Sequence, residues 1–153
     1  MRSVVREPAS IMVTAGARDA FRLVLSALRR EIHDRPLRIA VENPGYPSLH
    51  RIPAAFDHEI MPIPVDDHGL NPAYLPAENR PDLVLVAPSH QYPLGASMPV
   101  ARRLELLNWA AENDAFIVED DYDSELRYVG DPLPALAALA RDAGESAAAL
   151  DRV

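Results

Sequence analysis

The sequence predicts an α/β domain with a largely parallel sheet. Two apolar runs, residues 83–87 and 115–118, have the pattern of short strands that are covered on both faces. A helical pattern lies between them, and a longer one precedes all the predicted strands. Strands that alternate with helices at this spacing are typical of parallel α/β domains. With 153 residues and 48% apolar composition, the chain is long enough to build one compact core.

The first half of the chain predicts one helix and two strands. Apolar residues recur at helical spacing over residues 17–32, after a turn-like Thr14-Ala15-Gly16. Residues 37–41 form a short apolar run that the turn Asn43-Pro44-Gly45 closes, and residues 58–63 form another that ends at Pro64. Both runs are too short for a helix, so we expect strands.

The second helix is expected between the two apolar strands, with Pro99 at its start, where proline is tolerated. Its spacing predicts an apolar face formed by Leu104, Leu107 and Ala111. The charged residues are expected mostly on the opposite face: Arg102, Arg103, Glu105 and Glu112.

Two parts are expected along the chain. Residues 1–142 are predicted to form the domain, and residues 143–153 an exposed or disordered tail, because the chain from Arg141 onward has neither a sheet-like nor a strongly amphipathic pattern.

Composition excludes several function classes. The chain has 15 basic against 23 acidic residues, a net charge of −8, which has the wrong sign for direct nucleic-acid binding. All 15 basic residues are arginine, so this chain offers no lysine as a nucleophile or Schiff-base partner. Cysteine is absent, and no apolar run reaches the length of a membrane span. We expect a soluble, cytoplasmic protein with no membrane contact.

Polar residues follow the predicted strands at the edge where α/β domains bind ligands. The start of the first helix, residues 14–17, offers free amides to an anion, although a plain turn is the simpler interpretation. Tyr46 follows the first strand and could stack on a ligand or pack its own loop. Residues 88–95 form a loop with three polar side chains, which also fits an ordinary proline-rich turn.

An acidic loop, residues 119–125, places five carboxylates within seven residues at the end of a buried strand. Such a cluster costs stability unless water or something cationic faces it. A solvated loop, a cationic ligand and Mg²⁺ at Asp121 and Asp123 are all open interpretations. The histidine spacing forms no zinc motif, and the sequence has no serine-hydrolase elbow and no dinucleotide fingerprint.

Four segments in this order resemble the large domain of class I/II aminotransferases, which are fold type I pyridoxal-phosphate proteins. They are residues 13–20, 41–47, 88–95 and 117–125. The motifs S-H-Q-Y-P-L-G and E-D-D-Y-D-S-E are most similar to those of the aminotransferase-like effector domain of MocR-type transcription regulators. The resemblance runs from about residue 3 to residue 140 and implies an incomplete three-layer domain around a mostly parallel sheet.

The resemblance also implies a cofactor, pyridoxal 5′-phosphate, and roles for two residues at the end of the last strand. Asp120 would pair with the pyridine nitrogen and keep it protonated, so that the ring can withdraw electrons. Tyr122 would donate a hydrogen bond to the phenolic oxygen of the ring.

Four further residues take cofactor-binding roles by the same resemblance. Tyr46 would stack on the ring, and the amides of Ala17 and Arg18 would hold the phosphate. Tyr92 stands where many aminotransferases have an asparagine, and this favours the MocR-type branch.

The missing lysine separates this chain from a working transaminase, because the internal aldimine cannot form without it. The first hypothesis is therefore a partial aminotransferase-type domain that binds pyridoxal phosphate, has no catalytic residue of its own and is inactive alone. The alternative is an effector-sensing or dimerising part of a MocR-type regulator, and a third possibility is an inert remnant. The expected partners are an amino-acid-like small molecule and, in the complete protein, a second copy.

Overall fold

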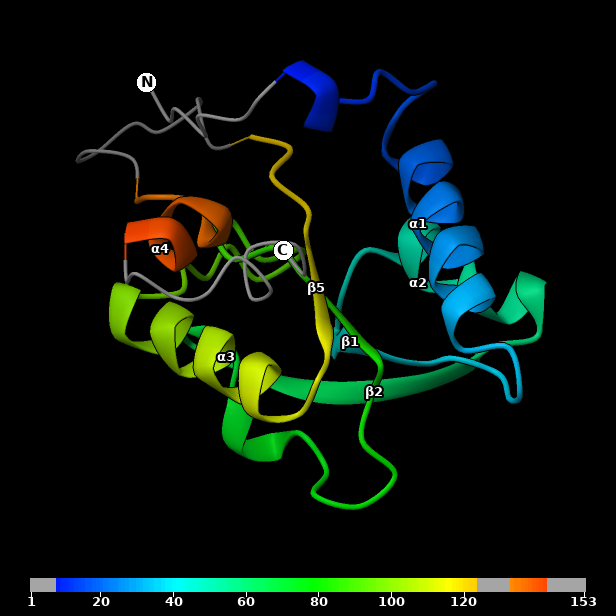
Figure 1. Cartoon of the computed structure of the whole chain (residues 1–153). Coiled ribbons are helices and arrows are strands. Elements are labelled where there is room, and N and C mark those ends of the chain that lie inside the picture. Colours follow the sequence, from blue (N-terminus) through cyan, green and yellow to red (C-terminus); the bar gives the residue numbers. More distant parts are fainter. Residues whose placement is uncertain (1–7, 124–132, 143–153) are drawn as a thin grey trace.

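A computed structural model describes residues 8–123 and 133–142 of the chain. Its centre is a five-stranded sheet with the strand order β3-β2-β1-β4-β5 (Figure 1). The strands are β1 (Arg38–Asn43), β2 (Glu59–Asp66), β3 (Gly69–Leu70), β4 (Leu83–Val86) and β5 (Phe116–Glu119). All neighbouring strands are parallel except β2 and β3. The predicted α/β class and the mostly parallel sheet are confirmed.

The chain changes direction across the sheet at β1. From β1 it moves to β2 on one side, and it later returns to place β4 on the other side of β1. In such sheets the crevice at the carboxyl ends of the two strands beside the reversal is the usual ligand site. The topology therefore draws attention to the loops that follow β1 and β4.

Helix α1 (Ala17–Glu31) covers one face of the sheet, and it begins where the sequence predicts. Its buried residues Phe21, Leu25 and Leu28 pack in one cluster with alternate residues of two central strands, Ile39, Val41, Leu83 and Leu85. Strand residues two apart point to the same face, so this cluster uses one face of β1 and β4.

Helices α3 (Val100–Glu112) and α4 (Leu136–Asp142) cover the other face (Figure 1). Leu106, Leu107 and Leu136 pack there with Ala40 and with the remaining residues of β4 and β5 that point this way, Val84, Val86 and Ile117. Helices on both faces of one sheet form the three layers that the resemblance implied.

The second strand is longer than predicted. Pro64 does not end β2, which continues to Asp66. Over most of its length β2 has β1 as its only described neighbour, since β3 pairs only with Val65 and Asp66. An edge strand tolerates proline because an outward-facing residue needs no N–H for the ladder.

Several short elements were not predicted from the sequence. They are β3, the one-turn helix α2 (Pro47–His50), helix α4 and three 3₁₀ turns, η1 (Pro8–Ser10), η2 (Pro53–Phe56) and η3 (Pro72–Tyr74). Most of these elements have four residues or fewer, too few for a periodic signal. Helix α4 includes Arg141, although the sequence from this residue onward has no strongly amphipathic pattern. The predicted tail, residues 143–153, lies outside the described residues, so the domain boundary stays a prediction.

The predicted apolar face of α3 was wrong at three positions. Arg103 is fully buried, whereas Leu104 and Ala111 are exposed. The buried set is Arg103, Leu106, Leu107 and Ala110, which has helical spacing of its own. An arginine replaces an apolar residue in this stripe because its polar atoms find partners inside the fold.

The partners of Arg103 come from three segments of the chain, and most of them are main-chain carbonyls. Its guanidinium donates to Met98 O at 2.9 Å, Pro88 O at 2.8 Å and Pro134 O at 3.0 Å. Its Nη1 also lies 3.6 Å from Glu119 Oε1. Arg103 thus joins the loop after β4, the end of β5 and the segment before α4.

None of the described helices is long and apolar enough to span a membrane.

We expect Arg103→Leu to destabilise the fold by about 3 kcal/mol or more, because it leaves buried carbonyls without their donor and the Glu119 carboxylate without its cationic neighbour. Urea unfolding followed by circular dichroism measures the change. Leu104→Ala, an exposed position on the same helix, is the control and should cost less than about 1 kcal/mol. Similar losses in the two variants would contradict this assignment.

Candidate cofactor site

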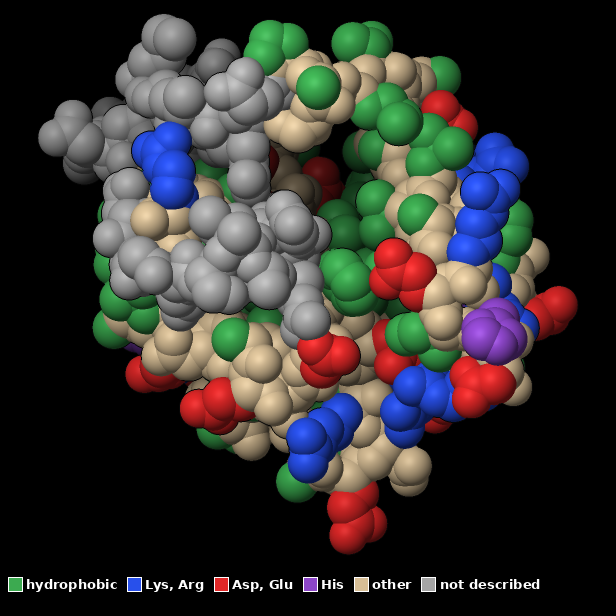
Figure 2. Space-filling model, viewed as in Figure 1, with side chains coloured by type: hydrophobic (Ala, Val, Ile, Leu, Met, Phe, Trp, Pro, Cys, Tyr) green, Lys and Arg blue, Asp and Glu red, His purple; other side chains and the backbone are tan. Residues whose placement is uncertain are grey.

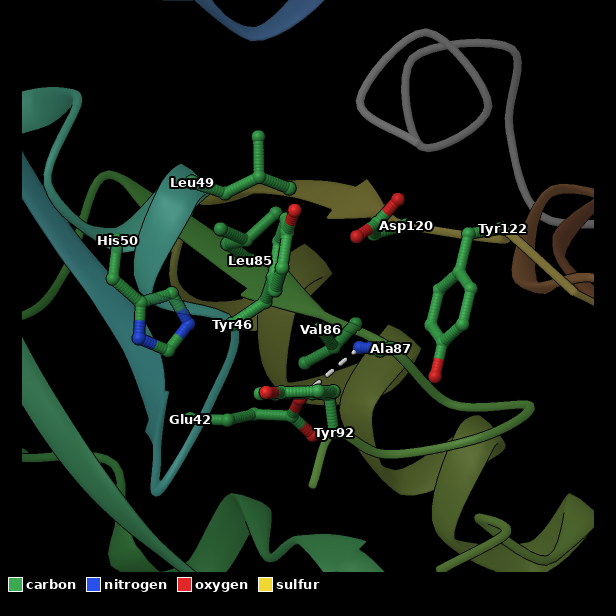
Figure 3. Close-up of a pocket in the computed structure, with 10 residues that line it drawn as sticks. All are labelled: Glu42, Tyr46, Leu49, His50, Leu85, Val86, Ala87, Tyr92, Asp120 and Tyr122. Carbon is green, nitrogen blue, oxygen red and sulfur yellow. Dashed lines mark hydrogen bonds between the residues drawn. The ribbon is translucent and has the colours of Figure 1, made fainter. Parts of the chain in front are cut away.

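A pocket opens at the carboxyl ends of β1, β4 and β5, beside the point where the sheet reverses direction. Its lining residues come from all three strand ends and the loops after them: Glu42, Tyr46, Leu49, His50, Leu85, Val86, Ala87, Tyr92, Asp120 and Tyr122. Figure 3 shows three tyrosine rings and the Asp120 carboxylate arranged around it. Segments about 75 residues apart in the chain therefore meet at one place.

The loop after β1 requires a glycine at position 45. A Cβ built on Gly45 would lie 1.9 Å from His50 Cε1 and 2.5 Å from Glu42 O, so no side chain fits. The following residue, Tyr46, precedes α2 and leaves its ring about half exposed at the pocket. Tight turning at Gly45 thus brings an aromatic face to the strand end.

Gln91 joins the loops that follow β1 and β4. The side chain is 0% exposed, and its amide donates to Pro44 O and to Tyr92 O, both at 2.7 Å. Its Oε1 accepts from Leu94 N at 3.3 Å. The two tyrosines carried by these loops meet edge to face, with 5.4 Å between the ring centroids of Tyr46 and Tyr92.

The chain leaving β5 supplies the acidic side of the pocket. Asp120 donates its amide to Val86 O at 2.8 Å, which extends the β4–β5 ladder by one residue. Burial raises the pKa of the Asp120 carboxyl above its ordinary value, and the nearby charges of Asp121 and Asp123 raise it further. A cation at this carboxylate would relieve the strain of burying it.

Tyr122 also reaches the loop after β4. Its hydroxyl donates to His90 O at 2.9 Å. The same histidine pairs through Nδ1 with Asp123 Oδ2 at 2.6 Å. In this structure the Tyr122 hydroxyl therefore donates its hydrogen bond to the protein. To donate to a ligand, it would have to give up the hydrogen bond to His90 O.

The structure places four of the six predicted site residues around the pocket: Tyr46, Tyr92, Asp120 and Tyr122. Ala17 and Arg18 are not among the lining residues. They lie at the beginning of α1, across the hollow that Figure 2 shows between this end of the helix and the end of β5. The roles of all six stay predictions.

The acidic loop is only partly described, because Ser124 and Glu125 lie outside the described residues. Within residues 8–123 and 133–142, no three His, Asp or Glu side chains are grouped as they would be to hold a metal ion.

Sequence reasoning missed Glu42 and His50 as pocket residues. Glu42 lies in the buried part of β1 and looked like a strand end, while His50 is on the unpredicted helix α2. A charged residue within an otherwise apolar strand was the available signal for Glu42.

The chain is similar to a group of transcription regulators over nearly its whole length. It is 53% identical over 142 residues to the HTH-type pyridoxine biosynthesis transcriptional regulator PdxR of Corynebacterium glutamicum, which covers 93% of this chain and 30% of the regulator. It is 37% identical over 140 residues to the probable rhizopine catabolism regulatory protein MocR of Rhizobium meliloti, across 90% of this chain and 27% of that protein. No protein-family model matches.

A solved aminotransferase shares the fold. LysN, the α-aminoadipate aminotransferase of Thermus thermophilus, superposes with a TM-score of 0.76 at 28% identity, over 86% of this chain and 34% of LysN. That structure is a complex with N-(5′-phosphopyridoxyl)-L-leucine. This chain is part of an aminotransferase class I/II fold and is similar to transcription regulators of the MocR type. The chain spans about 30% of the length of the curated relatives that it matches.

We expect Gln91→Met to lower the stability of the chain by about 2 kcal/mol, since two carbonyl oxygens lose their donor while the side-chain volume hardly changes. Urea unfolding measures the loss. Glu105→Met, which places the same side chain at an exposed position of α3, should stay within about 0.5 kcal/mol of the parent. A parent-like Gln91→Met variant would show that the amide does not hold the two loops.

Proposed function

We propose that this chain is the pyridoxal-phosphate-binding, effector-sensing part of a MocR-type transcription regulator. The observation that carries the proposal is the pocket in which Asp120 and three tyrosines meet at the switch point of the sheet. Similarity to two regulators across nine-tenths of the chain supports this role over that of a partial aminotransferase-type domain that is inactive alone, which was the first hypothesis from the sequence. A regulator with this role would act in the cytoplasm.

The groups in the pocket fit the ring of pyridoxal phosphate. Asp120 is a half-buried carboxylate, and the ring nitrogen of the cofactor is a cation when protonated. Tyr46 and Tyr92 offer aromatic surface, and Tyr122 offers a hydroxyl donor. When bound, this cofactor supplies an aldehyde that condenses with amines and a ring that accepts electrons.

The covalent part of such a site is missing from this chain, because its sequence contains no lysine. Binding would rest on the ring–carboxylate pair, on aromatic contacts and on the phosphate. The amides of Ala17 and Arg18, at the N-terminal end of α1, are our candidates for the phosphate, since free N–H groups and the helix dipole favour an anion there.

The name of one relative suggests which ligand is sensed. PdxR is described as a regulator of pyridoxine biosynthesis, so pyridoxal phosphate would be an effector as well as a cofactor for a close relative of that protein. An amino-acid-like molecule that condenses with the aldehyde is a second effector class. In the complete protein we expect two copies to associate.

We expect the purified chain to bind pyridoxal phosphate without a covalent bond to any internal residue. Absorbance titration measures binding, and borohydride reduction followed by peptide mapping detects covalent adducts. Pyridoxine 5′-phosphate, which lacks the aldehyde, should bind within about threefold of pyridoxal phosphate, because no lysine is present to use the aldehyde. A stoichiometric adduct on an internal residue would overturn the non-covalent assignment. If the chain shows no saturable binding, or no cooperative melting transition that the ligand raises, an inert remnant is favoured instead.

Asp120→Asn should weaken pyridoxal-phosphate binding about tenfold, because the neutral amide no longer stabilises a protonated ring. Asp67→Asn makes the same chemical change at an exposed position beyond the end of β2 and should leave the dissociation constant unchanged. Equal dissociation constants for the parent and Asp120→Asn would show that Asp120 does not stabilise the protonated ring.

The regulator and the enzyme differ in what adjoins this segment in the gene. A DNA-binding helix-turn-helix region encoded upstream is the expected result, since the curated relatives are named HTH-type regulators. An aminotransferase-like start without such a region would favour the enzyme.

A further inference from the structure

Glu42 places a carboxyl group at the base of the pocket, beneath the ring of Tyr92 (Figure 3). The residue is only 4% exposed. Its Oε2 accepts a hydrogen bond from Ala87 N at 3.2 Å, across the carboxyl ends of β1 and β4. Its Oε1 is buried and has no hydrogen-bond partner among the described residues. A buried carboxylate normally needs several donors or a cation, and only the Ala87 amide lies within full hydrogen-bonding geometry of this one, while the Gln91 side chain and the Leu70 amide add weaker contacts.

The charged and titratable groups around Glu42 do not compensate a negative charge. The end of β5 contributes Asp120 and Tyr122, the loop after β4 contributes Tyr92, and the loop after β1 with α2 contributes Tyr46 and His50. Strand β3 lies against Oε1 through Gly69, where a built Cβ would be 3.7 Å from that oxygen, and brings no charge. No arginine is among the described residues that line the pocket.

Burial is the largest cause of a shift that raises the pKa of Glu42 from 4.5 to about 7. The Ala87 amide, the Gln91 side chain and the Leu70 amide lower the pKa and offset burial only in part, and the charge of Asp120 adds to the increase. The raised pKa agrees with the presence of the unpartnered oxygen, because a buried carboxyl group without enough donors prefers to keep its proton.

We propose that Glu42 is a positioning residue that, as a neutral acid, ties the loop carrying Tyr46 to the loop carrying Tyr92, and that its ionisation loosens the pocket. Glu42 and Ala87 stand at the bases of these two loops, and Gln91 joins the same loops further out. A neutral Glu42 also leaves Asp120 as the carboxylate that faces a cationic ring. This inference deepens the proposed function, because the pocket is the proposed cofactor pocket.

The first experiment needs no ligand. A carboxyl whose pKa is higher in the folded than in the unfolded chain stabilises the fold most at low pH, and that contribution falls as pH rises through the interval from about 4.5 to about 7. Between pH 5 and pH 8 the unfolding constant of the parent should therefore rise roughly 70-fold more than that of Glu42→Gln, which stays neutral. Urea unfolding at a series of pH values measures both constants.

Glu112→Gln, at an exposed position of α3, is the matched control and should follow the parent at every pH. Identical pH profiles for the parent and Glu42→Gln would overturn the proposal. A Glu42→Gln chain that fails to fold would also overturn it, because a neutral isostere is predicted to be tolerated.

The second experiment tests positioning with pyridoxal phosphate as the probe. Glu42→Gln should bind at least as tightly as the parent at pH 8, whereas Glu42→Leu, which offers Ala87 N no acceptor, should bind at least fivefold more weakly at pH 6 and pH 8. Equal affinity of the Leu and Gln variants would show that the bridge does not position the pocket. If the parent and all variants fail to bind the probe, the proposed function fails, and the ligand-free profiles still decide the protonation of Glu42.

Discussion

Parallel pairing of β1 with β4 is the constraint on which the site depends. It sets Val41 beside Leu85, so the two strands end at the same edge and their following loops leave the sheet side by side. The pairing of β4 with β5 then adds Asp120 one residue beyond Glu119. Because parallel strands share the direction in which they end, three loops distant in sequence leave the sheet at the same edge.

Buried polar side chains help to hold these loops in place. Arg103 bonds to carbonyls on both sides of the loop after β4, Gln91 bonds to the loop after β1, and Glu42 receives the amide of Ala87. Loops expose backbone groups that a sheet or helix would satisfy internally, and a buried side chain can satisfy them instead. The position of the aromatic pair Tyr46 and Tyr92 follows from these bonds.

Similarity to regulators and to an aminotransferase is consistent with one fold serving two purposes. The pocket keeps the features suited to a pyridinium ring, while the chain provides no lysine for covalent catalysis. Holding a ligand requires only the first set of features, whereas turnover requires both. The described pocket supplies groups of the first set.

The sequence by itself determined the α/β class of the fold and four of the ten residues that line the pocket. Apolar runs and helical spacing identified α1, β1, β4 and β5, and the segments after the strands pointed to Tyr46, Tyr92, Asp120 and Tyr122. Only the tertiary structure decided that Arg103 belongs inside, that β2 continues through Pro64, and that Glu42 lies in the pocket without a partner for one oxygen. Periodicity records which faces are apolar, but whether a charged or proline residue is tolerated depends on carbonyls, amides and strand edges supplied by distant parts of the chain.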